Sequence, residues 1–215
     1  MSSPPAAFYF DLASPLAYLA AERVLHELPA AAEWRPVLAR ELPGSESFDA
    51  FRCSAEQDIF RAEIERRAHS LGLQPLRWPD PFPFDSTLAM RVATYAKSIG
   101  RAVPFAQAAF RQAFAGGRSL EDQDTVLIAA AACEMHPAAV LRGAALRSVA
   151  QQLAASTAEA AGAGVRDVPA IVLGGPGAGG PQAPADEQGR IFSGEIAVEE
   201  AATEMLDRAA GARGR

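Results

Sequence analysis

The stretch from Phe8 to Ala20 reads FYFDLASPLAYLA, and it decides how the rest of the chain is interpreted. Its first half belongs to an aromatic, apolar run over residues 6–12, which has the length and composition of a buried β-strand. Ser14 then stands directly before Pro15, where a serine hydroxyl caps a helix and proline suits the first helical position. Apolar residues recur at helical spacing beyond this point. The stretch therefore predicts a strand that turns sharply into a helix.

The order of predicted strands and helices along the rest of the chain indicates a fold class. Strand-like runs are found at residues 33–38, 168–173 and 190–193. Almost every segment between residues 44 and 162 has helical patterning, and residues 196–209 predict a closing helix. The order βαβ, helices, ββα is that of an α/β, thioredoxin-like domain that carries a large all-helical insertion. We assign the thioredoxin-like domain and the inserted helical domain, respectively, to residues 1–43 with 163–215 and to residues 44–162.

Composition and charge exclude several classes of function. The 215 residues are 49% hydrophobic and 21% charged, which is typical of a globular protein long enough to bury a sizeable core. The formal net charge of -6 provides no basic surface for nucleic acid or for an anionic membrane. The chain has no apolar stretch long enough to span a bilayer and no secretory leader. We therefore expect a cytoplasmic protein that binds neither nucleic acid nor membrane.

Cysteine and histidine spacing argues against metal and dithiol chemistry. Cys53 and Cys133 are far apart and form no CxxC motif, and the three histidines share no ligand spacing, so no metal is expected. The turn from Ser14 to Ala17 contains no thiol. Disulfide exchange at this turn is therefore excluded, because exchange requires a thiolate.

The turn at Ser14 is the first candidate site. A helix N-terminus presents unpaired backbone N–H groups and a favourable dipole, which stabilise a phosphate, a carboxylate or a thiolate. A thiol bound there would have its pKa lowered by the same field. Plain helix capping explains the same residues, and the local pattern does not decide between the two interpretations.

Val168 and Pro169, at the entrance to the third strand, form the second candidate site. Proline fits the first position of a strand, and it also fits a cis peptide bond in a tight bend. If the bond is cis, the backbone N–H and C=O of Val168 face outward and can pair with the main chain of a peptide-like ligand. In the other interpretation, the two residues simply begin a strand.

Four motifs together resemble one known family. FYFDLASPLAYLA, PFPFDSTLAMR at residues 81–91, VPAIVLGG at residues 168–175 and IFSGE at residues 191–195 are similar, in this order, to the 2-hydroxychromene-2-carboxylate isomerase family. This family groups with kappa-class glutathione transferases and DsbA-like proteins, and the resemblance covers nearly the whole chain. It implies a thioredoxin-like domain with an inserted helical domain, homodimer formation and glutathione as cofactor. It also implies that Ser14 contacts the glutathione sulfur and that Val168, before a cis Pro169, pairs with the cysteinyl backbone.

The resemblance further implies a function and a substrate. It predicts a glutathione-dependent isomerase or transferase acting on a small conjugated aromatic substrate such as 2-hydroxychromene-2-carboxylate. Trp78 and Phe84, in a segment rich in proline and aromatic residues, are the expected apolar wall of the substrate site. Asp85 stands where the family usually has asparagine, and it is the third residue expected to contact the substrate.

Departures from the family pattern keep a second reading open. Ile196 and Ala197 occupy the positions where the family has the acid and the arginine of its C-terminal motif. Glu195, one residue earlier, is therefore expected to accept the ammonium group of glutathione instead. The alternative is a diverged DsbA-like protein of the same fold that does not use glutathione and has no dithiol redox activity.

Overall fold

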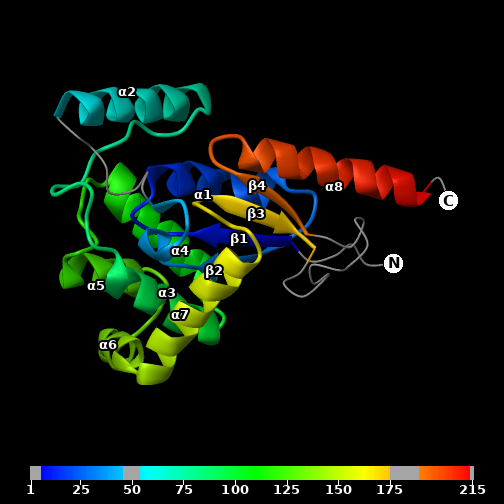
Figure 1. Cartoon of the computed structure of the whole chain (residues 1–215). Coiled ribbons are helices and arrows are strands. Elements are labelled where there is room, and N and C mark those ends of the chain that lie inside the picture. Colours follow the sequence, from blue (N-terminus) through cyan, green and yellow to red (C-terminus); the bar gives the residue numbers. More distant parts are fainter. Residues whose placement is uncertain (1–5, 46–53, 175–188, 214–215) are drawn as a thin grey trace.

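The computed structural model describes residues 6–45, 54–174 and 189–213 and contains one mixed sheet (Figure 1). The strands are β1 (Ala6–Phe10), β2 (Ala32–Pro36), β3 (Ala170–Leu173) and β4 (Arg190–Ser193). Their order is β2-β1-β3-β4, with β1 parallel to β2 and antiparallel to β3, and β3 antiparallel to β4. The predicted α/β thioredoxin-like layout is therefore confirmed. Pro36 lies in an edge strand, which is one of the two placements, edge or bulge, that its missing N–H group allows.

Helices lie against the sheet and build the insertion. The helices of the sheet layer are α1 (Pro15–Glu27) and α8 (Ala197–Arg213), which pack against each other. A short 3-10 helix, η1 (Ala39–Glu41), follows β2. The insertion contains α2 (Ser54–Ser70), α3 (Thr87–Ser98), α4 (Ala102–Phe110), η3 (Arg111–Ala115), α5 (Gln123–Ala131), α6 (Pro137–Ala145) and α7 (Arg147–Gly162). Helix α3 contacts α4, α5, α6 and α7, whereas α2 lies apart from them, above α1 in Figure 1.

One apolar core extends from the sheet into the helical block. The ring of Phe10 in β1 lies 5.9 Å from the ring of Phe110 in α4, and Tyr18 in α1 stacks on Phe114 at 5.6 Å. All four side chains are buried. The two segments that chain order assigns to different domains therefore share a core, and the division at residues 43 and 163 stays an interpretation of chain order.

Two segments, one rich in proline and one rich in glycine and proline, are expected from the sequence to be loops. The proline-rich segment between α2 and α3 has no regular secondary structure, as its density of proline residues predicts. The glycine and proline tract that we expect to form a hairpin loop or lid lies mostly outside the described residues, as does Cys53. Within the described ranges, none of the helices combines the length and the apolar character that crossing a membrane requires.

Candidate functional site

The structure brings the two candidate sites together at the carboxyl end of β1. Ser14 caps α1, and its Oγ accepts a hydrogen bond from the Ala17 N–H at 3.1 Å. The same hydroxyl donates to the carbonyl oxygen of Val168 at 3.4 Å, across 154 positions of sequence. A length of 3.4 Å is long for an O–H···O bond, so this donor is only weakly engaged. Ser14 is thus both a helix cap and a buried hydroxyl facing the loop before β3.

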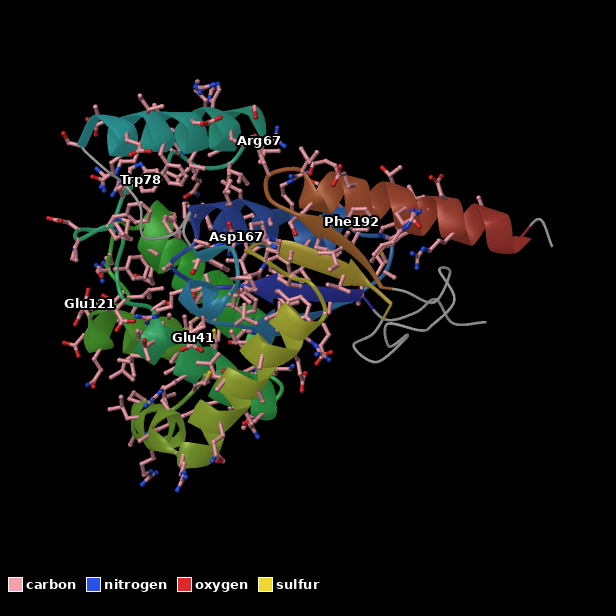
Figure 2. The ribbon with its side chains drawn as sticks, in the orientation of Figure 1. Glu41, Arg67, Trp78, Glu121, Asp167 and Phe192 are labelled. Carbon is pink, nitrogen blue, oxygen red and sulfur yellow. The ribbon has the colours of Figure 1, made fainter. Side chains whose placement is uncertain are left out.

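The Val168–Pro169 peptide bond is cis, which resolves the question that the sequence left open. The backbone N–H of Val168 donates to the Asp167 carboxylate at 2.7 Å. Asp167 is half-buried and lies close to the sheet in Figure 2. The main-chain donor that the family resemblance assigns to glutathione therefore already has an acceptor from its own chain.

Asp11 is buried three residues before Ser14 in the same turn, and it was not expected to have a role of its own. Its two carboxylate oxygens accept hydrogen bonds from the backbone N–H groups of Ala13 and Ala39, each at 2.9 Å. Burial raises the pKa of Asp11, and this effect outweighs the opposing hydrogen bonds. The carboxyl group joins the β1–α1 turn to η1. A carboxylate that ends an otherwise apolar aromatic strand was the signal available in the sequence.

Asp85 is held just before α3 by internal partners. Its Oδ1 accepts hydrogen bonds from the Thr87 N–H at 2.9 Å and the Thr87 hydroxyl at 2.6 Å, and it forms an ion pair with Arg40 of η1. Burial would raise the pKa of Asp85, but the hydrogen bonds from Thr87 and the Arg40 guanidinium together lower it. Asp85 therefore presents a neutralised carboxylate, and its contact with a substrate stays a prediction.

This environment predicts a pH-dependent contribution to stability. Because the pKa of Asp85 is lower in the folded chain than in the unfolded chain, the contribution is present above pH of about 4 and is lost as the pH falls through the folded value. Asp85→Asn should remove it. From urea unfolding, we expect the free energies of unfolding of wild type and Asp85→Asn to differ at pH 6 by at most about 1 kcal/mol, because the pair is exposed. This difference should shrink toward pH 3. A constant difference across this range would contradict the ion-pair assignment.

The residues predicted to form an apolar wall differ in exposure. Phe84 is buried in the core, whereas Trp78 is half-buried between α2 and η3 (Figure 2). The Trp78 ring lies 4.8 Å from that of Phe82 and 6.1 Å from that of Phe114, and its Nε1 donates to Glu65 at 2.7 Å. Phe114 continues this contact to α1. Trp78 is thus the more accessible of the two predicted wall residues.

Glu195 belongs to a network of ion pairs that joins three helices. It contacts Arg67, at the end of α2 in Figure 2, with 3.1 Å between a carboxylate oxygen and Nε. Arg67 also contacts Glu199 at 2.8 Å, and Glu199 contacts the buried Arg23 of α1 at 2.9 Å. The carboxylate expected to bind the ammonium group of a ligand therefore has an arginine partner in this structure.

The described part of the chain contains one buried cysteine and no group of side chains suited to bind a metal ion. Cys133, just after α5, is buried, and burial raises the pKa of its thiol. Its sulfur lies 3.3 Å from the carbonyl oxygen of Ala129, to which the thiol donates. Across residues 6–45, 54–174 and 189–213, no three side chains of the His, Cys, Asp or Glu type are grouped to hold a metal ion.

The sheet, the helical insertion and the turn that caps α1 define a protein of the thioredoxin-fold class. The sequence profile of the DSBA-like thioredoxin domain matches residues 7–200. The chain belongs to the DsbA-like thioredoxin domain family. Comparison with curated protein sequences gives no match.

Solved structures agree with this fold at low sequence identity. A 2-hydroxychromene-2-carboxylate isomerase is 16% identical with a TM-score of 0.76, covering 96% of this chain and 97% of the other. A probable DsbA oxidoreductase from Streptomyces coelicolor is 20% identical with a TM-score of 0.74, covering 94% and 88%. The cytosolic disulfide reductase DsbM from Pseudomonas aeruginosa, in a structure with GSH, is 12% identical with a TM-score of 0.63, covering 97% and 99%. These likenesses establish the fold.

Proposed function

We propose that this protein is a glutathione-dependent isomerase or transferase that acts on a conjugated aromatic substrate such as 2-hydroxychromene-2-carboxylate. The observation that carries the proposal is the Ser14 hydroxyl, placed at the start of α1 against the Val168 carbonyl in a turn without a thiol. Because this turn has no cysteine, a reactive sulfur at this place must come from a bound ligand. The motif resemblance and the fold likeness to an isomerase and to a GSH-bound reductase support the choice of glutathione.

Ser14 would hold the ligand sulfur in its charged form. Its hydroxyl proton is engaged at 3.4 Å with the Val168 carbonyl, and a thiolate is a stronger acceptor than this distant oxygen. The N-terminus of α1 adds a favourable field, which lowers the pKa of a nearby thiol. Glutathione would supply the thiol that adds reversibly to the conjugated double bond of the substrate. The serine itself stays a hydrogen-bond donor throughout.

The other expected contacts fit glutathione to different degrees. Asp85 is neutralised by Arg40, so a ligand carboxylate near it would not face an unpaired negative charge. Trp78 offers a half-buried aromatic face to a flat substrate. The Val168 N–H is bonded to Asp167 and Glu195 is paired with Arg67, so each of these groups would have to exchange a partner on binding.

These two internal pairings favour a second candidate function. A main-chain donor and a carboxylate that are both satisfied within the chain are what a protein that no longer binds glutathione would show. The second candidate is thus a diverged member of the fold with another ligand and no dithiol activity. The two candidates differ in whether glutathione binds at all.

Thermal shift measurements separate the two candidates. Wild type should be stabilised by millimolar glutathione, by an amount that follows the logarithm of ligand concentration over Kd. Ser14→Ala should lose most of this ligand-induced shift, although the loss of the cap lowers its own Tm. The shift with S-hexylglutathione, whose sulfur carries no ionisable proton, should depend less on Ser14. Wild type would then be assayed for isomerisation of the chromene carboxylate.

The matched control is Ser98→Ala, which removes an exposed serine near the end of α3. It should keep the full glutathione shift. Absence of any shift in wild type would contradict glutathione binding and favour the diverged candidate. Equal shifts in wild type and Ser14→Ala would leave glutathione as a ligand but would remove Ser14 from its site.

The proposal has two further consequences. It places the activity in the cytoplasm, where thiols are kept reduced. It also predicts a homodimer, because the family that the motifs resemble is usually dimeric. Light scattering of the purified protein tests the second consequence.

A further inference from the structure

A pocket of about 380 Å³ lies between η1, the first turns of α3, and α7. Neither Ser14 nor Val168 lines it. Arg40 and Thr87, the two partners of Asp85, form the side of the pocket nearest the candidate site. The pocket is therefore a separate cavity that shares one side with the site described above.

The pocket lining also includes Arg91, which lies one turn after Thr87 on the same face of α3 and has no anionic partner among the described residues. Arg91 is half-buried, and within residues 6–45, 54–174 and 189–213 its guanidinium makes no ion pair, hydrogen bond or stacking contact. Each of the other buried or half-buried arginines in the described ranges has an ion pair or a contact with an aromatic ring. They are Arg23, Arg35, Arg67 and Arg208, which pair with glutamates, and Arg61, which lies over the rings of Trp78 and Phe82.

Apart from Glu41, the remaining lining residues carry apolar side chains. Leu38 and Leu153 are buried and form its apolar side, together with Ala150 and Ala154 of α7. A cation that has lost part of its water and has no protein partner favours an anionic ligand, most strongly a carboxylate that accepts two N–H bonds in parallel. The alkyl groups favour an apolar body on that ligand.

Two further charges line the pocket. Arg40 is already neutralised by Asp85, so it adds little to the attraction for an anion. Glu41 (Figure 2) is an exposed carboxylate in the lining, where water screens its repulsion. Arg91 is therefore the group that determines the charge of the preferred ligand, which is negative.

We propose that this pocket binds a small organic anion with an apolar body, of the aromatic monocarboxylate class, and that Arg91 holds its carboxylate while Leu38, Leu153 and Ala154 contact its ring. The proposal does not depend on glutathione binding. If the proposed isomerase function holds, the pocket is also placed to take the carboxylate end of a conjugated substrate, beside the Arg40–Asp85 pair.

The test uses trans-cinnamate as the probe and its neutral amide as the comparison, with binding measured by isothermal titration calorimetry. Wild type should bind cinnamate saturably and the amide at least about tenfold more weakly, because the amide offers no charge to Arg91. Arg91→Gln should weaken cinnamate binding by a similar factor. Arg66→Gln removes an exposed arginine of α2 and should leave the affinity unchanged.

Two more variants keep the test independent of folding effects at Arg91. Ala154→Leu keeps every charge and fills the pocket from an exposed position of α7, so it should abolish binding. Glu41→Gln should tighten binding about twofold by removing a screened repulsion. The proposal is overturned if wild type shows no saturable binding, or if Arg91→Gln and Ala154→Leu bind as wild type does. Failure of the glutathione thermal shift would leave this test unaffected.

Discussion

Phe110→Ala is expected to reduce the free energy of unfolding by about 3–5 kcal/mol, because a fully buried ring is replaced by a cavity in a core that relaxes only in part. The ring lies between Phe10 of β1 and Tyr18 of α1, at centroid distances of 5.9 Å and 6.2 Å. The substitution therefore weakens the packing between the sheet layer and the helical block. Urea unfolding followed by circular dichroism gives the change directly, provided that the m value stays constant.

The matched control is Ile59→Ala, which truncates an aliphatic side chain of α2 that is 69% exposed. It should change the free energy of unfolding by less than about 1 kcal/mol. Because one core serves both parts, Phe110→Ala should also unfold in one transition. Two separate transitions, or a loss no larger than that of the control, would mean that the sheet layer and the helical block are stable independently.

Asp11→Ala is expected to cost about 2–4 kcal/mol of stability. The substitution leaves the N–H groups of Ala13 and Ala39 buried without an acceptor, and each such group carries a penalty of about 1–3 kcal/mol. Relief from burying a carboxyl group offsets part of this loss, since burial raises the pKa of Asp11. Urea unfolding at a fixed pH measures the net effect.

Asp11→Asn serves as the comparison, because its single carbonyl oxygen can accept only one of the two bonds. Its stability should lie between those of wild type and Asp11→Ala. The raised pKa of Asp11 also sets the direction of a pH effect on stability. Because the folded chain holds the Asp11 proton more tightly than the unfolded chain, wild type loses stability as the pH rises from about 4 through the pKa of the folded state. Neither variant should show that loss. An alanine variant as stable as wild type would show that the two N–H groups find other acceptors.

The strand and helix around Ser14 could be predicted because their chemistry is local. A serine before a proline caps a helix through its own neighbours, and the structure shows this cap with the Ala17 N–H. Pro36 indicates an edge strand or a bulge, because a proline has no N–H to donate to a neighbouring strand, and the structure shows the edge position. Structural effects that a residue exerts on its neighbours along the chain can therefore be predicted from a single sequence.

Residues that act through distant partners were harder to predict. The Ser14 contact with Val168 was not predicted, because no local pattern joins positions so far apart, and the two residues were expected to form separate candidate sites. Glu195 was expected to bind a ligand, and in the structure it pairs with Arg67 of α2. Arg91 gave no signal, since an arginine on a predicted helix is ordinary. Its lack of a partner among the described residues is a property of the fold.

The order of the strands has a consequence for how the protein is made. During synthesis β1 can pair with β2 early, but its other edge waits for β3 until the helical block has been translated. The 154 positions between Ser14 and Val168 correspond to roughly 8–30 s at the usual rates of translation. During that interval β1 has an open edge, whose unpaired N–H and C=O groups can pair with another chain. The contact between Ser14 and Val168 is thus among the last to form, and a chain cut short before β3 has a half-built sheet and no site.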